Sequence, residues 1–192
     1  TNPTQTFGNF TYNSATSTGT MSVFTSGTTA VIQGNLTILA SNTGKFRALT
    51  SGTLTINGNL IVSGGTFEVA STTGTLNVLG NVSLTGGVFD VAQGGASNLK
   101  VKGNFVQTGG SLQQTSGSGT LEFNGVVSQT FTPATVTASS FLNIRVNNEF
   151  YVCPVFNEAI GDGKKVRIKD IERMWGIGTP EDLNYFLEHY KG

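Results

Sequence analysis

Apolar and polar residues alternate with a period of two through most of residues 7–148. Phe67 and Val69, for example, flank Glu68, and the same pattern surrounds Asp90. Such alternation places every second side chain on one face of a strand, so each stretch predicts a short β-strand with one buried face. Apolar residues at helical spacing do not separate these strands, which argues against an alternating β/α fold.

The strands belong to a repeat of 22–24 residues that is marked by a Gly-Asn pair. Each unit contains about three short strands separated by Gly-rich corners, which is typical of a β-solenoid. We therefore predict an all-β fold, a right-handed parallel β-solenoid of about six coils with a small α+β tail at the C-terminus. The residue pattern does not itself fix the handedness. The pairs are Gly34-Asn35, Gly58-Asn59, Gly80-Asn81 and Gly103-Asn104.

Stacked coils bring equivalent residues into rows that are spaced by about 4.8 Å. Phe67, Phe89 and Leu112 are predicted to form one inner row. The asparagines of the pairs are predicted to form a structural amide ladder at one corner, with each side chain bonding to the next. The glycines of the pairs are expected to allow a positive φ at that corner. The predicted ladder consists of Asn35, Asn59, Asn81 and Asn104.

Two groups of charged residues fall into rows on the outside of the predicted coils. Lys100, Glu122 and Arg145 occupy one position on successive coils, where opposite charges are mildly favourable. Glu68 and Asp90 share another position and are candidate binding residues. Carboxylates about 5–5.5 Å apart form the site of retaining glycosidases. The alternative interpretation is two solvated side chains on a polar face.

The distribution of charge divides the chain into two parts. The whole sequence has 192 residues, with 11 Lys and Arg and 11 Asp and Glu. Residues 1–147 hold five basic and three acidic residues, whereas residues 148–192 hold six and eight. The only Cys, Trp and His also lie in the second part. We therefore predict a repeat domain at 1–147 and an α+β tail at 148–192.

Composition also excludes several classes of function. Zero net charge argues against a nucleic-acid partner, because phosphate binding needs an excess of Lys and Arg. The sequence has no run of about 18 apolar residues, so no membrane span is expected. One Cys and one His exclude a disulfide framework, a Cys-rich zinc site and an all-His metal centre. We expect no cofactor and no metal.

Residues 7–148 resemble the Gly-Asn-rich β-solenoid segments of large bacterial cell-surface proteins, especially adhesin-like proteins. The Gly-Asn units carry this resemblance, together with the closing segment that runs from Phe123-Asn124-Gly125 to Asn147-Asn148. The resemblance implies an extracellular or cell-surface location and a role as a spacer, stalk or fibre subunit.

The tail has a different pattern. Alternation predicts a strand that reaches Cys153, which we interpret as a buried structural thiol. A helix is predicted over 180–190, with Thr179 as the N-cap and Pro180 at the first helical position. The predicted apolar face of this helix consists of Leu183, Phe186, Leu187 and Tyr190.

Residues 150–157 and 175–183 resemble the C-terminal segment of sugar-phosphate nucleotidyltransferases. The family's N-terminal nucleotide-binding loop has no counterpart in residues 1–147, and the Asp that many members place before a Gly-Thr step is missing before Gly178-Thr179. The resemblance implies common ancestry or a splice without activity, so we do not expect an enzyme. Asn157 is a candidate sugar contact, and Trp175 is either a core residue or a sugar platform.

The sequence as a whole predicts a structural or adhesive extracellular solenoid whose tail is a cap, a joint or a fusion. The expected partners are further copies of the chain, arranged head-to-tail or laterally, and surface glycans. The alternatives are a carbohydrate-active or carbohydrate-binding β-helix, or an inactive nucleotidyltransferase fragment.

Overall fold

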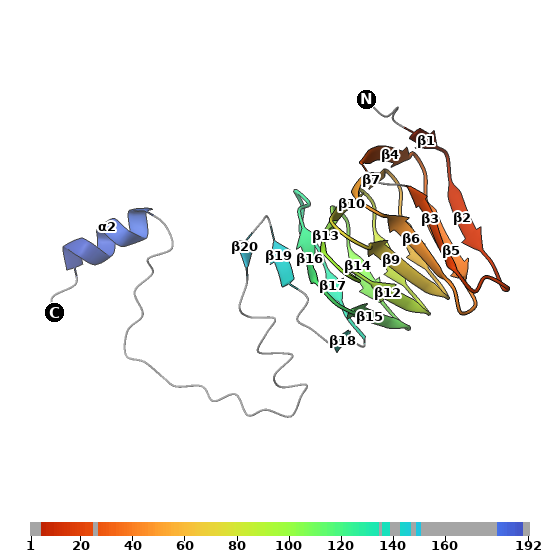
Figure 1. Ribbon diagram of the computed structural model, residues 1–192. Coiled ribbons are helices and arrows are strands. Elements are labelled where there is room, and N and C mark those ends of the chain that lie inside the picture. The colour runs from red at the N-terminus through yellow and green to blue at the C-terminus, as the bar shows by residue number, and fades with distance from the viewer. Residues whose placement is uncertain are drawn as a thin grey trace. The chain divides into compact units, whose positions relative to one another are not determined.

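The computed structural model describes residues 5–24, 27–134, 136–138, 143–146, 149–150 and 180–189. Contacts divide the chain into two units, Thr1–Tyr151 and Val152–Gly192, each of which is described by itself. The first unit is a β-solenoid of about six turns, built from stacked parallel sheets (Figure 1). The fold class predicted from the repeat is confirmed.

Each complete coil contributes one strand to each of three sheets, which we call A, B and C. Sheet A contains β1 (Gln5–Phe7), β4 (Thr28–Ile32), β7 (Gly52–Ile56), β10 (Gly74–Val78), β13 (Ala96–Val101), β16 (Ser118–Phe123), β19 (Asn143–Val146) and β20 (Glu149–Phe150). Sheet B contains β2 (Phe10–Asn13), β5 (Leu36–Ala40), β8 (Leu60–Val62), β11 (Val82–Leu84), β14 (Phe105–Gln107) and β17 (Phe131–Thr132). Sheet C contains β3 (Thr20–Phe24), β6 (Lys45–Leu49), β9 (Thr66–Ala70), β12 (Val88–Asp90), β15 (Ser111–Gln114) and β18 (Val136–Ala138).

The described strands pair in parallel between coils, except for the last pair in sheet A. Strand β20 runs antiparallel to β19, with Arg145 opposite Phe150 and Val146 opposite Glu149. The short strand therefore covers the β19 edge with the reverse chain direction. Parallel strands elsewhere continue without a break from the first coil to the last (Figure 1).

The inner rows predicted from the repeat are confirmed. Phe67 pairs with Phe89 and Phe89 with Leu112, and all three side chains are fully buried. The row begins one coil earlier, because the ring of Phe46 stacks on that of Phe67 with centroids 6.1 Å apart. Aromatic pairs of this kind contribute about 0.5–1.5 kcal/mol beyond their buried area. The row therefore fixes the register of neighbouring coils.

The glycines of the Gly-Asn pairs have a steric role and not the expected conformational one. Among the described residues, positive φ occurs at other positions, which include the Gly-Gly steps at Gly65 (70°), Gly87 (75°) and Gly110 (70°). A Cβ placed on Gly58 would lie 2.6 Å from the carbonyl oxygen of Gly34 on the preceding coil. The expectation of positive φ at these pairs was wrong, because the spacing between coils is what excludes a side chain there.

The asparagines form a ladder, but the bonds differ from those predicted. The backbone N–H of Asn59 donates to Oδ1 of Asn35, and the N–H of Asn81 donates to Oδ1 of Asn59, each at 2.8 Å. Each side chain therefore bonds to the next backbone and not to the next side chain. The ladder also extends beyond the predicted residues. The outer bonds run from Asn35 N–H to Asn9, from Asn104 N–H to Asn81 and from Thr130 N–H to Asn104.

The described part of the second unit is helix α2 (Pro180–His189). It begins at the predicted proline, which confirms a helix at this position. Phe186 is half-buried and Leu187 is exposed. Thr179, Tyr190 and the side chain of Leu183 lie outside the described residues. The strand predicted to reach Cys153 is described only at Glu149–Phe150.

We predict that Gly58→Ala lowers the free energy of unfolding by about 1–3 kcal/mol, because the new methyl group overlaps the preceding coil. Chemical denaturation measures the change. Gly8→Ala is the matched control, since Gly8 precedes Asn9 in the same way but a Cβ placed on it would have no atom within 4 Å. Equal losses in the two variants would contradict the steric explanation.

We predict that Asn59→Ala lowers the free energy of unfolding by about 0.5–1.5 kcal/mol, because the N–H of Asn81 loses its acceptor. Asn59→Asp keeps an acceptor oxygen and is expected to remain close to the parent protein. Denaturation of both variants checks this. A loss in Asn59→Asp as large as that in Asn59→Ala would show that the side-chain NH₂ group carries the ladder.

Candidate functional site

The two candidate carboxylates of the repeat lie side by side on sheet C. Glu68 of β9 pairs with Asp90 of β12, as their common position in the repeat predicts. The polar row continues on both sides, with Arg47 of β6 before Glu68 and Gln113 of β15 after Asp90. The site thus spans four successive coils.

Glu68 is enclosed by two cations from the preceding coil. Its side chain has no exposed surface. Lys45 Nζ lies 2.5 Å from Oε1, and Arg47 Nη2 lies 2.9 Å from Oε2. Arg47 also donates from Nη2 to Oε1 of Gln93 at 2.8 Å, which fixes the guanidinium in place. Both oxygens of Glu68 are therefore engaged.

Asp90 is held by hydrogen bonds from its own coil and the next one. It is 1% exposed. Oδ1 accepts the backbone N–H of Ala92 at 3.1 Å and that of Thr115 at 3.2 Å. Oδ2 accepts the Thr115 hydroxyl and the Gln113 side-chain amide. These hydrogen bonds replace the water that a surface carboxylate would bind.

This geometry overturns the interpretation of Glu68 and Asp90 as solvated side chains. Burial of two carboxylates is tolerated because Lys45 and Arg47 balance their charges and the remaining lone pairs are hydrogen-bonded. A glycosidase pair must flank an open substrate position, whereas neither carboxylate here is exposed. The arrangement clamps neighbouring coils together.

The cations of this clamp were missed because they lie in a coil that departs from the repeat. Lys45 and Arg47 follow no Gly-Gly step, so their alignment with Glu68 was not recognised. The buried phenylalanine between them, Phe46, was the available signal. Its place one coil before Phe67 would have put both cations on the outer face next to Glu68.

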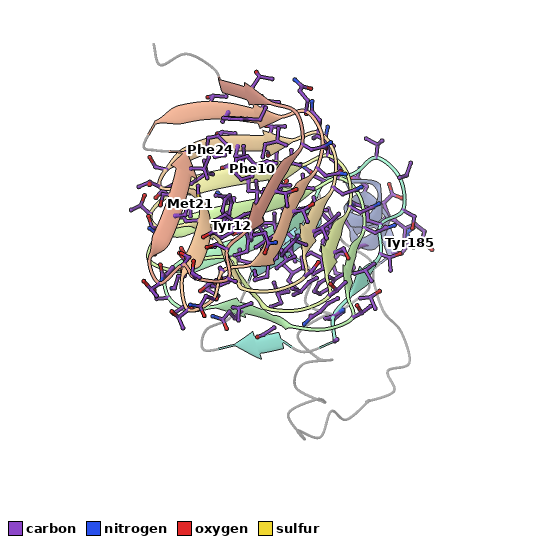
Figure 2. All side chains as sticks on the ribbon, turned by 90° about the vertical axis from the view of Figure 1, so that its right-hand side faces the viewer. Phe10, Tyr12, Met21, Phe24 and Tyr185 are labelled. Carbon is purple, nitrogen blue, oxygen red and sulfur yellow. The ribbon has the colours of Figure 1, made fainter. Side chains whose placement is uncertain are left out.

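A second candidate site is the exposed face of the first coil. The strands β1, β2 and β3 are the end strands of their sheets within the described chain. Figure 2 shows Phe10, Tyr12, Met21 and Phe24 gathered at this end of the core. Met21 is 43% exposed, although it lies opposite the fully buried Phe46. Within the described residues, the first coil therefore combines exposed Met21 and half-buried Phe10 with strand edges that no other described strand covers.

The opposite end of the described solenoid is built differently. Strand β20 covers β19 of sheet A, and the side chain of Gln129 occupies the Gly-Asn corner. Gln129 accepts the N–H of Gly125 at 2.7 Å and donates to the carbonyl of Val101 at 2.9 Å. The two ends of the solenoid thus present unlike edges.

A third candidate is a groove of about 270 Å³ on the outer side of sheet A. The repeat pattern did not indicate this groove, because the groove lies between a row of outward strand residues and a row of corner residues, and each row collects residues from successive coils. The lining residues are Thr55, Asn77, Val78, Leu79, Lys100, Lys102 and Asn124. Lys100 belongs to the predicted charged row and pairs with Glu122 at 3.1 Å.

The candidate residues of the tail, Asn157 and Trp175, lie outside the described residues, as does Cys153. His189 ends helix α2, where its exposed ring stacks on that of Tyr185. In the described ranges, no cluster of three or more His, Cys, Asp or Glu side chains is placed to hold a metal ion.

We predict that Glu68→Gln lowers the free energy of unfolding by about 1.5–3 kcal/mol, because Lys45 and Arg47 are left together without an opposing charge. Lys45→Gln is expected to cost less, since Arg47 still pairs with Glu68. Urea denaturation of both single variants and the double variant measures the coupling. An unfolding midpoint unchanged in Glu68→Gln would contradict the clamp.

No helix among the described residues has the length and hydropathy to cross a membrane. Comparison with known proteins gave no matching family model and no match among curated proteins or solved structures.

Proposed function

We propose that this protein is a structural solenoid that acts as a spacer, stalk or fibre subunit at a bacterial cell surface. The observation that carries the proposal is the unbroken ladder of hydrogen bonds from Asn9 to Thr130, which links one coil to the next through the whole stack. With about six turns at about 4.8 Å each, the solenoid is roughly 25–30 Å long. The resemblance of the repeats to adhesin-like segments supports the extracellular setting.

The distribution of buried polar groups also favours a structural role. The most deeply buried acidic side chains, Glu68 and Asp90, join coils and present no reactive oxygen to solvent. In a repeat protein the stability is approximately a sum of coil stabilities and nearest-neighbour contacts. Clamps of this kind add to the nearest-neighbour contacts, which is what a rod under tension requires.

A second copy of the chain is the proposed partner of the first coil. Each later coil covers the core of the coil before it, and a second copy would cover Phe10, Met21 and the edges of β1–β3, with its strands antiparallel to them in the two-fold arrangement. Head-to-tail stacking would have to join the first coil of one copy to the last coil of another. There the antiparallel strand β20 covers the edge of sheet A. Two first coils related by a two-fold axis join like edges and form a closed dimer.

We predict that the purified chain forms a dimer and that Met21→Glu shifts it to the monomer, because a charge is then buried between the two copies. Analytical ultracentrifugation measures the mass, and electron microscopy the shape. Val106→Glu is the control, since Val106 is 38% exposed on the outer face of sheet B and lies several coils away from the first coil.

Three results would contradict this assembly. Monomers at high concentration, or a dimer insensitive to Met21→Glu, would exclude the first coil as the interface. Filaments in the micrographs would favour head-to-tail stacking over the two-fold arrangement.

A further inference from the structure

The positive charge of the solenoid is concentrated on one side. Residues 1–147 hold five basic and three acidic residues. On sheet C, Lys45 and Arg47 balance Glu68 and Asp90. The excess of two positive charges therefore falls on sheet A and on the corner that follows each sheet A strand along the chain. The charged residues there are Lys100, Lys102 and Arg145, opposed by Glu122.

The groove on sheet A lies within this positive region. One wall consists of the outward residues Thr55, Asn77 and Lys100 on successive strands, and the other of the corner residues Leu79, Lys102 and Asn124. Lys100 is already paired with Glu122. Lys102 is exposed, and the described residues place no carboxylate within ion-pair distance of it. It is therefore available to an acidic ligand.

A buried acceptor in the same groove lacks a hydroxyl or amide donor. Asn124 Oδ1 is shielded from solvent, and no donor among the described residues reaches it. A buried acceptor without a partner is unfavourable and needs an explanation. Across the groove, the side-chain NH₂ of Asn77 makes only a long 3.4 Å contact with the Thr55 hydroxyl. The NH₂ of Asn77 can therefore donate to a polyhydroxylated ligand, and Asn124 Oδ1 can accept from one if the Asn124 side chain rotates into the groove.

We propose that this groove binds a sugar residue that carries a carboxylate group. Lys102, assisted by Lys100, attracts the carboxylate, and the Asn124 side chain, once it rotates toward the ligand, accepts a hydroxyl of the sugar ring through Oδ1. Leu79, which is 39% exposed, covers the ring's apolar face. A fully ionised anion such as sulfate has no hydrogen to donate, so it would pair with the lysines but leave Asn124 Oδ1 without a hydrogen-bond donor. Its volume lies just below the usual range for small-molecule sites, roughly 300–1,000 Å³, which suits a single ring.

The proposal is tested by titrating the full chain with short glucuronate oligosaccharides and with uncharged glucose oligosaccharides of the same length. Calorimetry or NMR measures the affinity. The acidic oligosaccharides are expected to bind more tightly. Lys102→Gln is expected to weaken that binding by about 10- to 100-fold, as for the loss of a charged hydrogen bond. Asn124→Ala is expected to weaken it by about 3- to 10-fold.

Asn57→Ala is the matched control, because Asn57 occupies the corner position one coil before Leu79 but does not line the groove. It is expected to leave binding unchanged. Absence of binding by the glucuronate oligosaccharides overturns the proposal, as does equal binding of the glucose oligosaccharides. Binding that is unaffected by Asn124→Ala and matched by inorganic sulfate also overturns it, because it would reflect charge attraction alone.

Discussion

The axial spacing of the coils is the constraint on which the rest of this structure depends. Parallel strands stack about 4.8 Å apart, so each residue lies against its equivalents on the neighbouring coils. Glycine is required at the Gly-Asn corner because a Cβ on Gly80 would lie 2.5 Å from the carbonyl oxygen of Gly58. The asparagine that follows can then bond to the next backbone at the same spacing. One geometric requirement thus accounts for the most regular feature of the sequence.

The same spacing brings charged side chains at equivalent positions close together, so each such charge needs an opposite charge or a hydrogen-bond donor beside it. Two carboxylates on neighbouring coils repel each other, and Glu68 and Asp90 are tolerated because Lys45 and Arg47 lie on one side and donor groups on the other. Charges that lie on sheet A are balanced less completely, which leaves Lys102 exposed in a groove. Positions that repeat in every coil hold the stack together, whereas charged positions that differ between coils make one surface of the stack different from another.

These surfaces bear on function in different ways. A continuous stack provides length and rigidity, and within the described residues its first coil has strand edges and an exposed Met21 to which the proposed second copy would bind. The groove adds a polar, positively charged surface along the side of the stack. The proposed structural role and the proposed glycan-binding role are compatible, because they would use different faces of the same coils.

The sequence by itself determined the coil length, the strands and the inner row from Phe67 to Leu112, because a period of two within a repeat of 22–24 residues is a local pattern. The helix that begins at Pro180 was likewise predictable from local signals. Only the tertiary structure decided the reason for the glycines, the direction of the asparagine bonds and the cations around Glu68. The groove lined by Asn124 was likewise decided only by the tertiary structure. Each of these depends on distances between atoms of different coils, and residues some 22 positions apart in the chain become neighbours only when the coils stack.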